Sequence, residues 1–191
     1  RRFDREQGRR IHAISAGTAI RAQSEQVGEP EMGYSTLAQI LRRRGVAKDR
    51  LNEKQAVELF RRMVFNILID NTDDHEKNHA LLMDDPLGVR QLRLAPAYDV
   101  LPSNSGQGHQ EFKCGQDGFD STLSNAMSEC EFFGLSNAEA LSEVEAIVDV
   151  VNGWKEHFKA IGVSDADTQT LAQTIDGPSL LDQRNNLSAL T

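Results

Sequence analysis

Two short stretches of the chain carry side chains suited to binding a divalent metal ion or orienting a reacting hydroxyl group. The first is residues 71–78, NTDDHEKN, and the second is residues 95–99, APAYD. Asp73 and Asn78 form a D-x-x-x-x-N step, and Asp99 follows a predicted hairpin. In kinase-type phosphoryl transfer, one carboxylate orients the attacking hydroxyl, while an Asn five residues later and a second carboxylate bind Mg²⁺ on the nucleotide phosphates. This order predicts phosphoryl transfer, with Asp73 catalytic and Asn78 and Asp99 as metal ligands.

Other side chains nearby have both a functional and a structural interpretation. His75 could reach a phosphate oxygen or fix the loop, and Lys77 could neutralise the transferred phosphoryl group or simply be solvated. Asp74 is expected to be a solvated neighbour of the catalytic residue. Tyr98 is expected to pack against apolar side chains and so to hold Asp99.

A long buried helix is predicted to anchor the first stretch. Residues 52–69 show apolar side chains at three- and four-residue steps, which is typical of a helix with one buried face. Asn52 and Gln55 have the spacing of a capping box at its start. The helix would end directly before the NTDDHEKN loop and keep that loop rigid.

The elements after this loop are predicted from turn and cap signals. Residues 81–83 and 90–94 are expected to form a hairpin around a turn that contains Pro86 and Gly88. Residues 102–121 are rich in Gly, Ser and Gln, so they are expected to form a loop. Further helices are expected over 35–44, from a capping box at Ser136 and Glu139 to about Phe158, and from Ser164 to about Ile175, with Pro178 limiting any further helix. The predicted fold is mainly α, a helical lobe with a short β-hairpin that carries the catalytic and metal-binding loops.

Composition narrows the class of protein. The chain has 191 residues, 39% of them hydrophobic, which is enough for one substantial core over residues 1–191. It has no apolar run long enough to span a membrane, and two cysteines, Cys114 and Cys130, fit a reducing cytoplasm. The formal net charge is −8, and the later part is the acidic part, which argues against nucleic acid as its main partner.

Four blocks of the sequence resemble the HipA family of bacterial serine/threonine kinases, which are toxins of toxin–antitoxin systems. The blocks are RFDR at 2–5, NTDDHEKN at 71–78, LAPAYD at 94–99 and FGLS at 133–136. The resemblance implies a mostly helical carboxy-terminal kinase lobe with a protein-kinase-like fold. It also implies ATP and Mg²⁺ as cofactors and a protein hydroxyl as the acceptor.

The resemblance assigns roles and partners as well. It implies that Asp73 is the catalytic residue, that Asn78 and Asp99 bind Mg²⁺, that His75 lies on the phosphate side of the loop, and that Phe3 belongs to the hinge that holds adenine. Implied partners are a protein substrate, with an aminoacyl-tRNA synthetase as one candidate, and an antitoxin protein through which any contact with DNA would be indirect.

The same residues leave alternatives open. A small-molecule hydroxyl kinase would use the same D-x-x-x-x-N loop, and a non-catalytic lobe that binds a partner would keep it as a relic. A metal-hydrolase cluster built from Asp73, Asp74, His75 and His79 is a further alternative. The Gly-rich loop and the ATP-pairing lysine of an amino-terminal lobe are absent from these 191 residues. We therefore expect the chain to be part of a longer protein and to have little kinase activity alone.

Overall fold

An antiparallel hairpin carries the polar loops. In the computed structural model, β4 (Ala80–Asp84) pairs with β5 (Gln91–Leu94), and Leu81 lies opposite Leu94. Both of these leucines are buried. The predicted hairpin is therefore confirmed, while its predicted turn lies outside the described residues. The structure describes residues 2–6, 8–24, 30–84, 91–103 and 105–190.

A third strand, which the sequence analysis did not predict, completes the sheet. β3 (Ala13–Ser15) pairs antiparallel with β4, so that the strand order is β3-β4-β5. Three residues are too few to show an alternating pattern, so no periodicity marks this strand. A separate ribbon of β1 (Arg5–Glu6) and β2 (Arg9–Arg10) precedes it.

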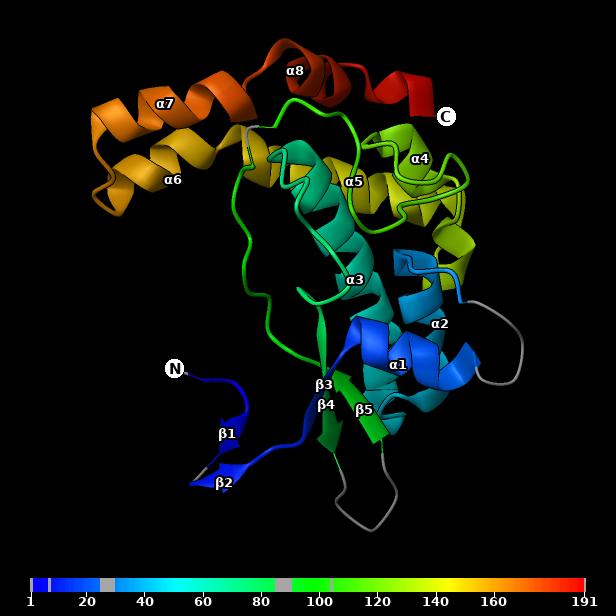
Figure 1. The fold of residues 1–191 in the computed structure, drawn as a ribbon. Helices are drawn as coiled ribbons and strands as arrows, with labels where there is room; N and C mark the ends of the chain where they lie inside the picture. The colour runs from blue at the N-terminus through cyan, green and yellow to red at the C-terminus, as the bar shows by residue number, and fades with distance from the viewer. Residues whose placement is uncertain (1, 7, 25–29, 85–90, 104, 191) are drawn as a thin grey trace.

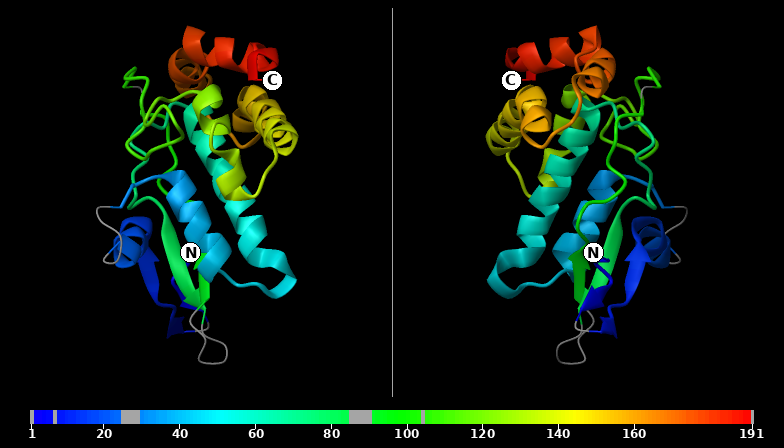
Figure 2. Two further views of the ribbon diagram at one scale, coloured as in Figure 1. Left: turned by 90° about the vertical axis from the view of Figure 1, so that its right-hand side faces the viewer. Right: turned by 90° about the vertical axis from the view of Figure 1, so that its left-hand side faces the viewer.

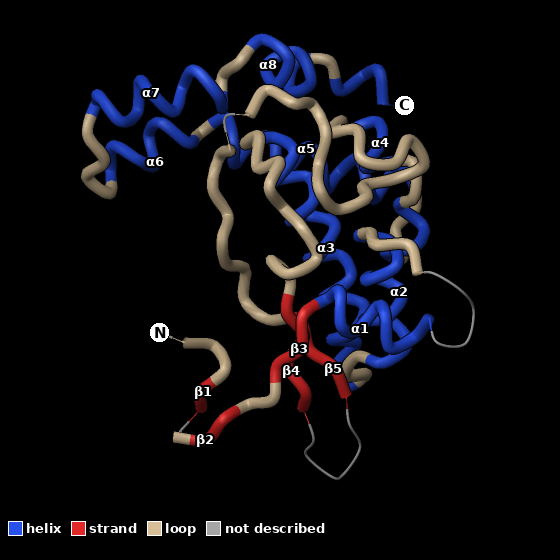
Figure 3. The backbone as a smooth tube through the Cα atoms, in the orientation of Figure 1, coloured by secondary structure: helices blue, strands red, loops and turns tan. Residues whose placement is uncertain are grey.

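Helices make up most of the fold (Figure 3). The longest, α3, runs from the sheet towards the helices of the carboxy-terminal half, and the sheet lies at the opposite end from α7 and α8 (Figures 1 and 2). The mainly α fold with a small sheet agrees with the predicted class. The helices and 3₁₀ turns are α1 (Ala16–Ser24), α2 (Tyr34–Arg44), η1 (Lys48–Arg50), α3 (Leu51–Leu68), α4 (Leu123–Met127), η2 (Cys130–Phe133), α5 (Asn137–Asn152), α6 (Trp154–Ala160), α7 (Asp165–Ile175), α8 (Pro178–Asn185) and η3 (Leu187–Leu190).

The apolar stripe of α3 is buried as predicted, but its start differs. The predicted core positions of this helix are all 0% exposed: Ala56, Phe60, Met63, Val64 and Ile67. The helix starts after Arg50, whose backbone is left-handed, and no side chain caps it. Asn52 instead donates to the carbonyl of Arg42, and Gln55 accepts from the amide of Leu94, so the predicted capping box is wrong. Both side chains make tertiary contacts that sequence spacing does not reveal.

Two helices of the carboxy-terminal half begin at their predicted caps, but the extent of the helices differs from the prediction at two other places. Ser136 and Glu139 form a capping box at the start of α5, and Ser164 caps α7, as predicted. The helix expected to reach Phe158 is interrupted at Gly153, where α5 ends and α6 begins. Pro178 starts α8 instead of limiting a further helix, because proline at the first helical position loses no hydrogen bond.

Two further findings concern membrane-spanning helices and cysteines in the described part of the chain. None of its helices combines the length and the apolar character needed to cross a membrane. Cys114 and Cys130 are both buried free thiols.

Candidate active site

The loop between α3 and β4 is shaped by main-chain hydrogen bonds. Asp70, at the end of α3, has a left-handed backbone with φ of 58°, and the amide of Asn71 donates to the carbonyl of Asn66 at 2.9 Å. A left-handed residue is a common way to end a helix. The amide of Asn78 donates to the carbonyl of His75 at 2.9 Å, which closes the turn before β4.

Asp73 lies on the exposed side of this loop. Its backbone amide donates to Ser103 Oγ at 3.1 Å. Among the described residues its carboxylate accepts no hydrogen bond and forms no ion pair. The carboxylate is therefore available to accept a hydrogen bond from a bound hydroxyl group.

Asn78 is tied to the same loop by one end of its amide. Its Nδ2 atom donates to the main-chain carbonyl of Asp73 at 3.1 Å, and the residue is only 8% exposed. Within the described part of the chain, Oδ1 accepts no hydrogen bond. The amide is thus oriented so that its oxygen, the atom that Mg²⁺ would bind, remains free.

Asp99 faces the same cavity as Asn78. Both residues border a cavity of about 520 Å³ that lies beside α3. Asp99 is exposed, and its φ of 56° is left-handed, a conformation that Asp tolerates better than most residues. The sequence-predicted metal pair is therefore brought to one cavity.

A tyrosine joins the two polar loops. Tyr98 donates from its hydroxyl to the carbonyl of Lys77 at 2.5 Å, and its ring stacks on Phe3 with 5.4 Å between ring centres. Burial raises the pKa of Tyr98, and the charges of Asp99 and Asp74 raise it further. The stacking on Phe3 confirms the predicted packing of Tyr98 against an apolar side chain, while its role in holding Asp99 stays a prediction.

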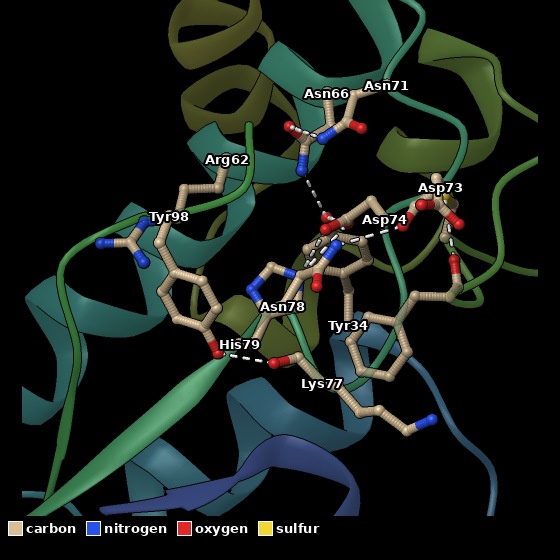
Figure 4. A network of polar contacts seen from close by, with 12 residues as sticks. Tyr34, Arg62, Asn66, Asn71, Asp73, Asp74, Lys77, Asn78, His79 and Tyr98 are labelled. Carbon is tan, nitrogen blue, oxygen red and sulfur yellow. Dashed lines mark hydrogen bonds and ion pairs between the residues drawn. The ribbon is translucent and has the colours of Figure 1, made fainter. Parts of the chain in front are cut away.

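The prediction for Asp74 is wrong. We expected a solvated neighbour of Asp73, but Asp74 is 2% exposed and lies in a buried polar network (Figure 4). Its carboxylate accepts from the hydroxyl of Tyr34, and His79 Nε2 lies 3.1 Å from its Oδ1. A buried carboxylate is costly unless hydrogen bonds satisfy it. Sequence spacing gave no signal, because Tyr34 is 40 residues away.

The network continues from Tyr34 into α3. Asn66 donates to the hydroxyl of Tyr34 at 3.0 Å, and Asn71 donates to Asn66 Oδ1 at 3.1 Å. Burial raises the pKa of Tyr34 well above its ordinary value, and the charge of Asp74 raises it further. The hydroxyl of Tyr34 therefore stays protonated and can act as a donor.

The three other predicted site residues lie around this centre. Lys77 is exposed, and its side chain points away from the buried network (Figure 4). His75 is half-buried, and its Nδ1 is buried without a hydrogen-bond partner in the described residues. Phe3 borders a second cavity, of about 320 Å³, together with Ala80 and Tyr98.

The segment after Asp99 is tethered to the loop, which sequence analysis did not foresee. The amide of Ser103 donates to the carbonyl of Asp70 at 2.8 Å, and the hydroxyls of Ser105 and Thr72 lie 2.7 Å apart. The amide of Glu111 donates to the carbonyl of Thr72 at 3.2 Å. In the described residues between 102 and 121 there is no helix or named strand, as predicted.

The donor set fits magnesium better than a hydrolytic metal centre. In the part of the chain that the structure describes, no three His, Cys, Asp or Glu side chains gather to hold a metal ion. The alternative of a metal-hydrolase cluster is therefore wrong, since only Asp74 and His79 of its four residues come together. Asp99 and Asn78 offer two oxygen ligands, which suits Mg²⁺ because it usually keeps several waters and binds substrate phosphates.

Comparison with solved structures places this fold in a known class. The chain resembles a chain of the solved complex of the toxin–antitoxin system HipA, HipB and its operator DNA from Shewanella oneidensis MR-1, with a TM-score of 0.69 at 14% identity. The match covers 99% of the present chain and 49% of the other, so the chain spans about half of that relative's length. The fold is therefore that of a HipA-type helical lobe.

A family model makes the assignment specific. The model of the HipA-like C-terminal domain matches residues 1–155. The chain belongs to the family of HipA-like C-terminal domains. No curated protein matched the chain in a separate comparison.

Proposed function

We propose that this chain is the carboxy-terminal lobe of a serine/threonine-protein kinase that transfers the γ-phosphate of ATP to a protein hydroxyl. The observation that carries the proposal is the placement of the three predicted residues. The carboxylate of Asp73 has no partner among the described residues, while Asn78 and Asp99, whose side chains carry oxygen atoms, border one cavity. Kinase-type transfer needs this set of groups.

Each residue has a role in the proposed reaction. Asp73 accepts a hydrogen bond from the attacking hydroxyl and aims its oxygen at the γ-phosphorus. Asn78 and Asp99 would hold Mg²⁺, which when bound offsets the charge of the nucleotide phosphates. Positioning and charge stabilisation account for most of the catalysis in this reaction class.

Three further residues would surround the nucleotide. Phe3 borders the cavity that it shares with Tyr98 and Ala80, which supports a place for adenine there. His75 and Lys77 lie on the loop between Asp73 and Asn78, where they would approach the phosphates. The exposed side chain of Lys77 would have to turn towards the cavity to do so.

The biological setting is proposed from the relatives. The solved relative belongs to a toxin–antitoxin system and is assembled with HipB and operator DNA. We propose by analogy that the complete protein is a toxin restrained by an antitoxin, through which it meets DNA indirectly. Its acceptor would be a protein, with an aminoacyl-tRNA synthetase as one candidate.

Nucleotide binding by the protein expressed from its complete reading frame tests the metal assignment. Thermal unfolding is measured with Mg·ATP, with ATP plus a chelator and without ligand, for the wild type, Asp99→Asn and Asp149→Asn. Asp149 is an exposed carboxylate on α5 and serves as the matched control. We expect Mg·ATP to stabilise the wild type and Asp149→Asn but to stabilise Asp99→Asn much less, because ligand binding stabilises the folded state by mass action. Equal shifts in all three proteins would remove Asp99 from the site.

Phosphotransfer itself needs a second measurement. Transfer of labelled phosphate from ATP is followed into protein and, separately, into small-molecule hydroxyl acceptors. Label in protein Ser or Thr supports the proposal. Label only in small molecules supports the small-molecule kinase, and no transfer despite Mg·ATP binding supports a non-catalytic lobe.

A further inference from the structure

The buried carboxylate of Asp74 lies directly beside the proposed catalytic residue in the chain. We propose that Asp74, held by Tyr34 and His79, is the positioning residue that fixes the loop presenting Asp73 and Asn78. That this loop is catalytic rests on the proposed function, whereas the positioning itself can be tested without it.

Hydrogen bonds hold the Asp73–Asp74 peptide unit on both sides. The carbonyl of Asp73, which begins the Asp73–Asp74 peptide, accepts from Asn78 Nδ2 at 3.1 Å. The side chain of Asp74, which follows that peptide, accepts from Tyr34 and lies within 3.2 Å of His79 Nε2. The peptide unit therefore has little freedom to rotate, and this fixes the direction in which the side chain of Asp73 points away from the backbone.

The network joins two helices to the loop and to the junction of that loop with β4. Tyr34 is the first residue of α2, Asn66 lies in α3, Asp74 is in the loop, and His79 directly precedes β4. All four side chains are almost completely buried. His79 Nδ1 is buried without a hydrogen-bond partner in the described residues, but the other contacts of these side chains pair buried groups with one another. They allow few alternative arrangements, because another arrangement would leave further buried groups unpaired. The loop is thus fixed relative to both helices and to the sheet.

Aromatic packing holds the two donors in place. The ring of Tyr34 packs edge-on against His79 with 5.1 Å between ring centres, and His79 stacks on Phe112 at 5.5 Å. The amide of Tyr34 donates to the carbonyl of Lys113 at 3.0 Å. Residues that fix a functional group act best when their own conformations are locked by packing, and this is the case here.

A positioning residue differs from a purely structural core residue in the effects that its substitution has on the loop and on turnover. If Asp74 positions the loop, weakening its contacts should loosen Asp73 and Asn78 more than the rest of the molecule. Turnover should then fall more than nucleotide affinity does, because misplacement of the acceptor affects the reacting geometry. A merely structural residue would lower stability without this pattern.

The first test measures the loop itself, without nucleotide. Amide hydrogen exchange at Asn78 is compared in the wild type, Tyr34→Phe and Thr122→Val. Tyr34→Phe removes the hydroxyl that donates to Asp74 and accepts from Asn66. Thr122→Val removes a hydroxyl that caps α4, away from the loop. We expect exchange at Asn78 to rise about tenfold in Tyr34→Phe, the scale of one lost hydrogen bond to a charged group, and to stay unchanged in Thr122→Val. Unchanged exchange in a folded Tyr34→Phe would overturn the proposal.

The second test uses the complete protein and its phosphotransfer kinetics. We expect Tyr34→Phe to lower kcat about tenfold and to change the KM for Mg·ATP less than about twofold, with Thr122→Val near wild type. The double variant Tyr34→Phe with Asp74→Asn should be no worse than Asp74→Asn alone, because both act through one contact. Additive losses would overturn the positioning role. A wild type that transfers no phosphate would refute the proposed function but leave the exchange result standing.

Discussion

The hydroxyl of Tyr98 donates a 2.5 Å hydrogen bond to the main-chain carbonyl of Lys77. This contact joins the loop that holds Asp73 and Asn78 to the loop that holds Asp99. The two proposed metal ligands come from segments 21 residues apart, so the cavity between them depends on contacts of this kind. Tyr98 also stacks on Phe3, which links the same point to the second cavity.

Removal of this hydroxyl should weaken the site while keeping the fold. In Tyr98→Phe the ring can still stack on Phe3, but the carbonyl of Lys77 loses its donor. We expect a loss of about 1 kcal/mol in the free energy of unfolding and a smaller stabilisation by Mg·ATP. Chemical denaturation and thermal shifts measure the two effects. A variant with wild-type values for both would show that the contact does not link the loops.

Alkaline pH should destabilise the protein through groups that the fold keeps protonated. Burial raises the pKa of both tyrosines, Tyr34 and Tyr98, and also that of Cys114. A raised pKa means that the unfolded chain releases its proton first, so stability is complete below the unfolded values and falls above them. The loss should begin at about pH 8.5 for the thiol and steepen above about pH 10 for the tyrosines.

Tyrosinate absorbance followed together with circular dichroism tests this. We expect ionisation of Tyr34 to coincide with unfolding, because its hydroxyl is buried against Asp74. Ionisation of both tyrosines near pH 10 with the fold intact would contradict the burial argument. The chain has only these two tyrosines, so the two signals can be separated with Tyr34→Phe.

Two glycines in one turn should respond very differently to alanine. A Cβ atom at Gly115 would lie 2.0 Å from the carbonyl oxygen of Asn125, whereas one at Gly118 would meet no atom within 4 Å. Gly118 has a φ of 68°, so the only cost of alanine there is the free energy needed to hold a residue with a Cβ atom in the left-handed conformation. We expect a loss of at least about 3 kcal/mol for Gly115→Ala and about 1 kcal/mol for Gly118→Ala. Equal losses in denaturation would show that the backbone around Asn125 adapts easily.

Local signals in the sequence predicted elements that depend on local interactions. The caps at Ser136 and Ser164 were predicted correctly because each side chain bonds an amide three residues away. Gln55 has similar spacing from Asn52, but it accepts from Leu94, 39 residues away, and this tertiary contact replaced the expected cap.

The candidate site was predictable only in part. Asn78 and Asp99, which the sequence singled out, border one cavity, whereas Asp73 lies on the exposed side of the same loop and does not border it. The catalytic and metal-binding roles of these three residues stay predictions. The burial of Asp74 was not predictable, because its partner Tyr34 begins a helix far away in the sequence. Adjacent carboxylates with different surroundings look alike in a sequence, since burial depends on packing between distant elements.

The sharpest prediction compares these two adjacent carboxylates in the protein expressed from its complete reading frame. Asp73→Gln removes an exposed carboxylate that has no partner among the described residues, so we expect little change in stability or in Mg·ATP binding. It should nevertheless lower phosphotransfer at least about a hundredfold, because the attacking hydroxyl loses its acceptor. Phosphotransfer rates, calorimetric Mg·ATP binding and thermal unfolding measure the three quantities.

Asp74→Asn should affect stability more, and phosphotransfer less, than Asp73→Gln does. It places an amide beside the Nε2 atom of His79, in a site that is 2% exposed, so we expect a loss of about 1–3 kcal/mol in stability. Its phosphotransfer should fall less than that of Asp73→Gln, because the catalytic carboxylate remains while its position loosens. If Asp73→Gln retains normal transfer, the catalytic assignment is wrong. If neither substitution alters transfer, the kinase proposal fails and a lobe that only binds a partner becomes the better explanation of this site.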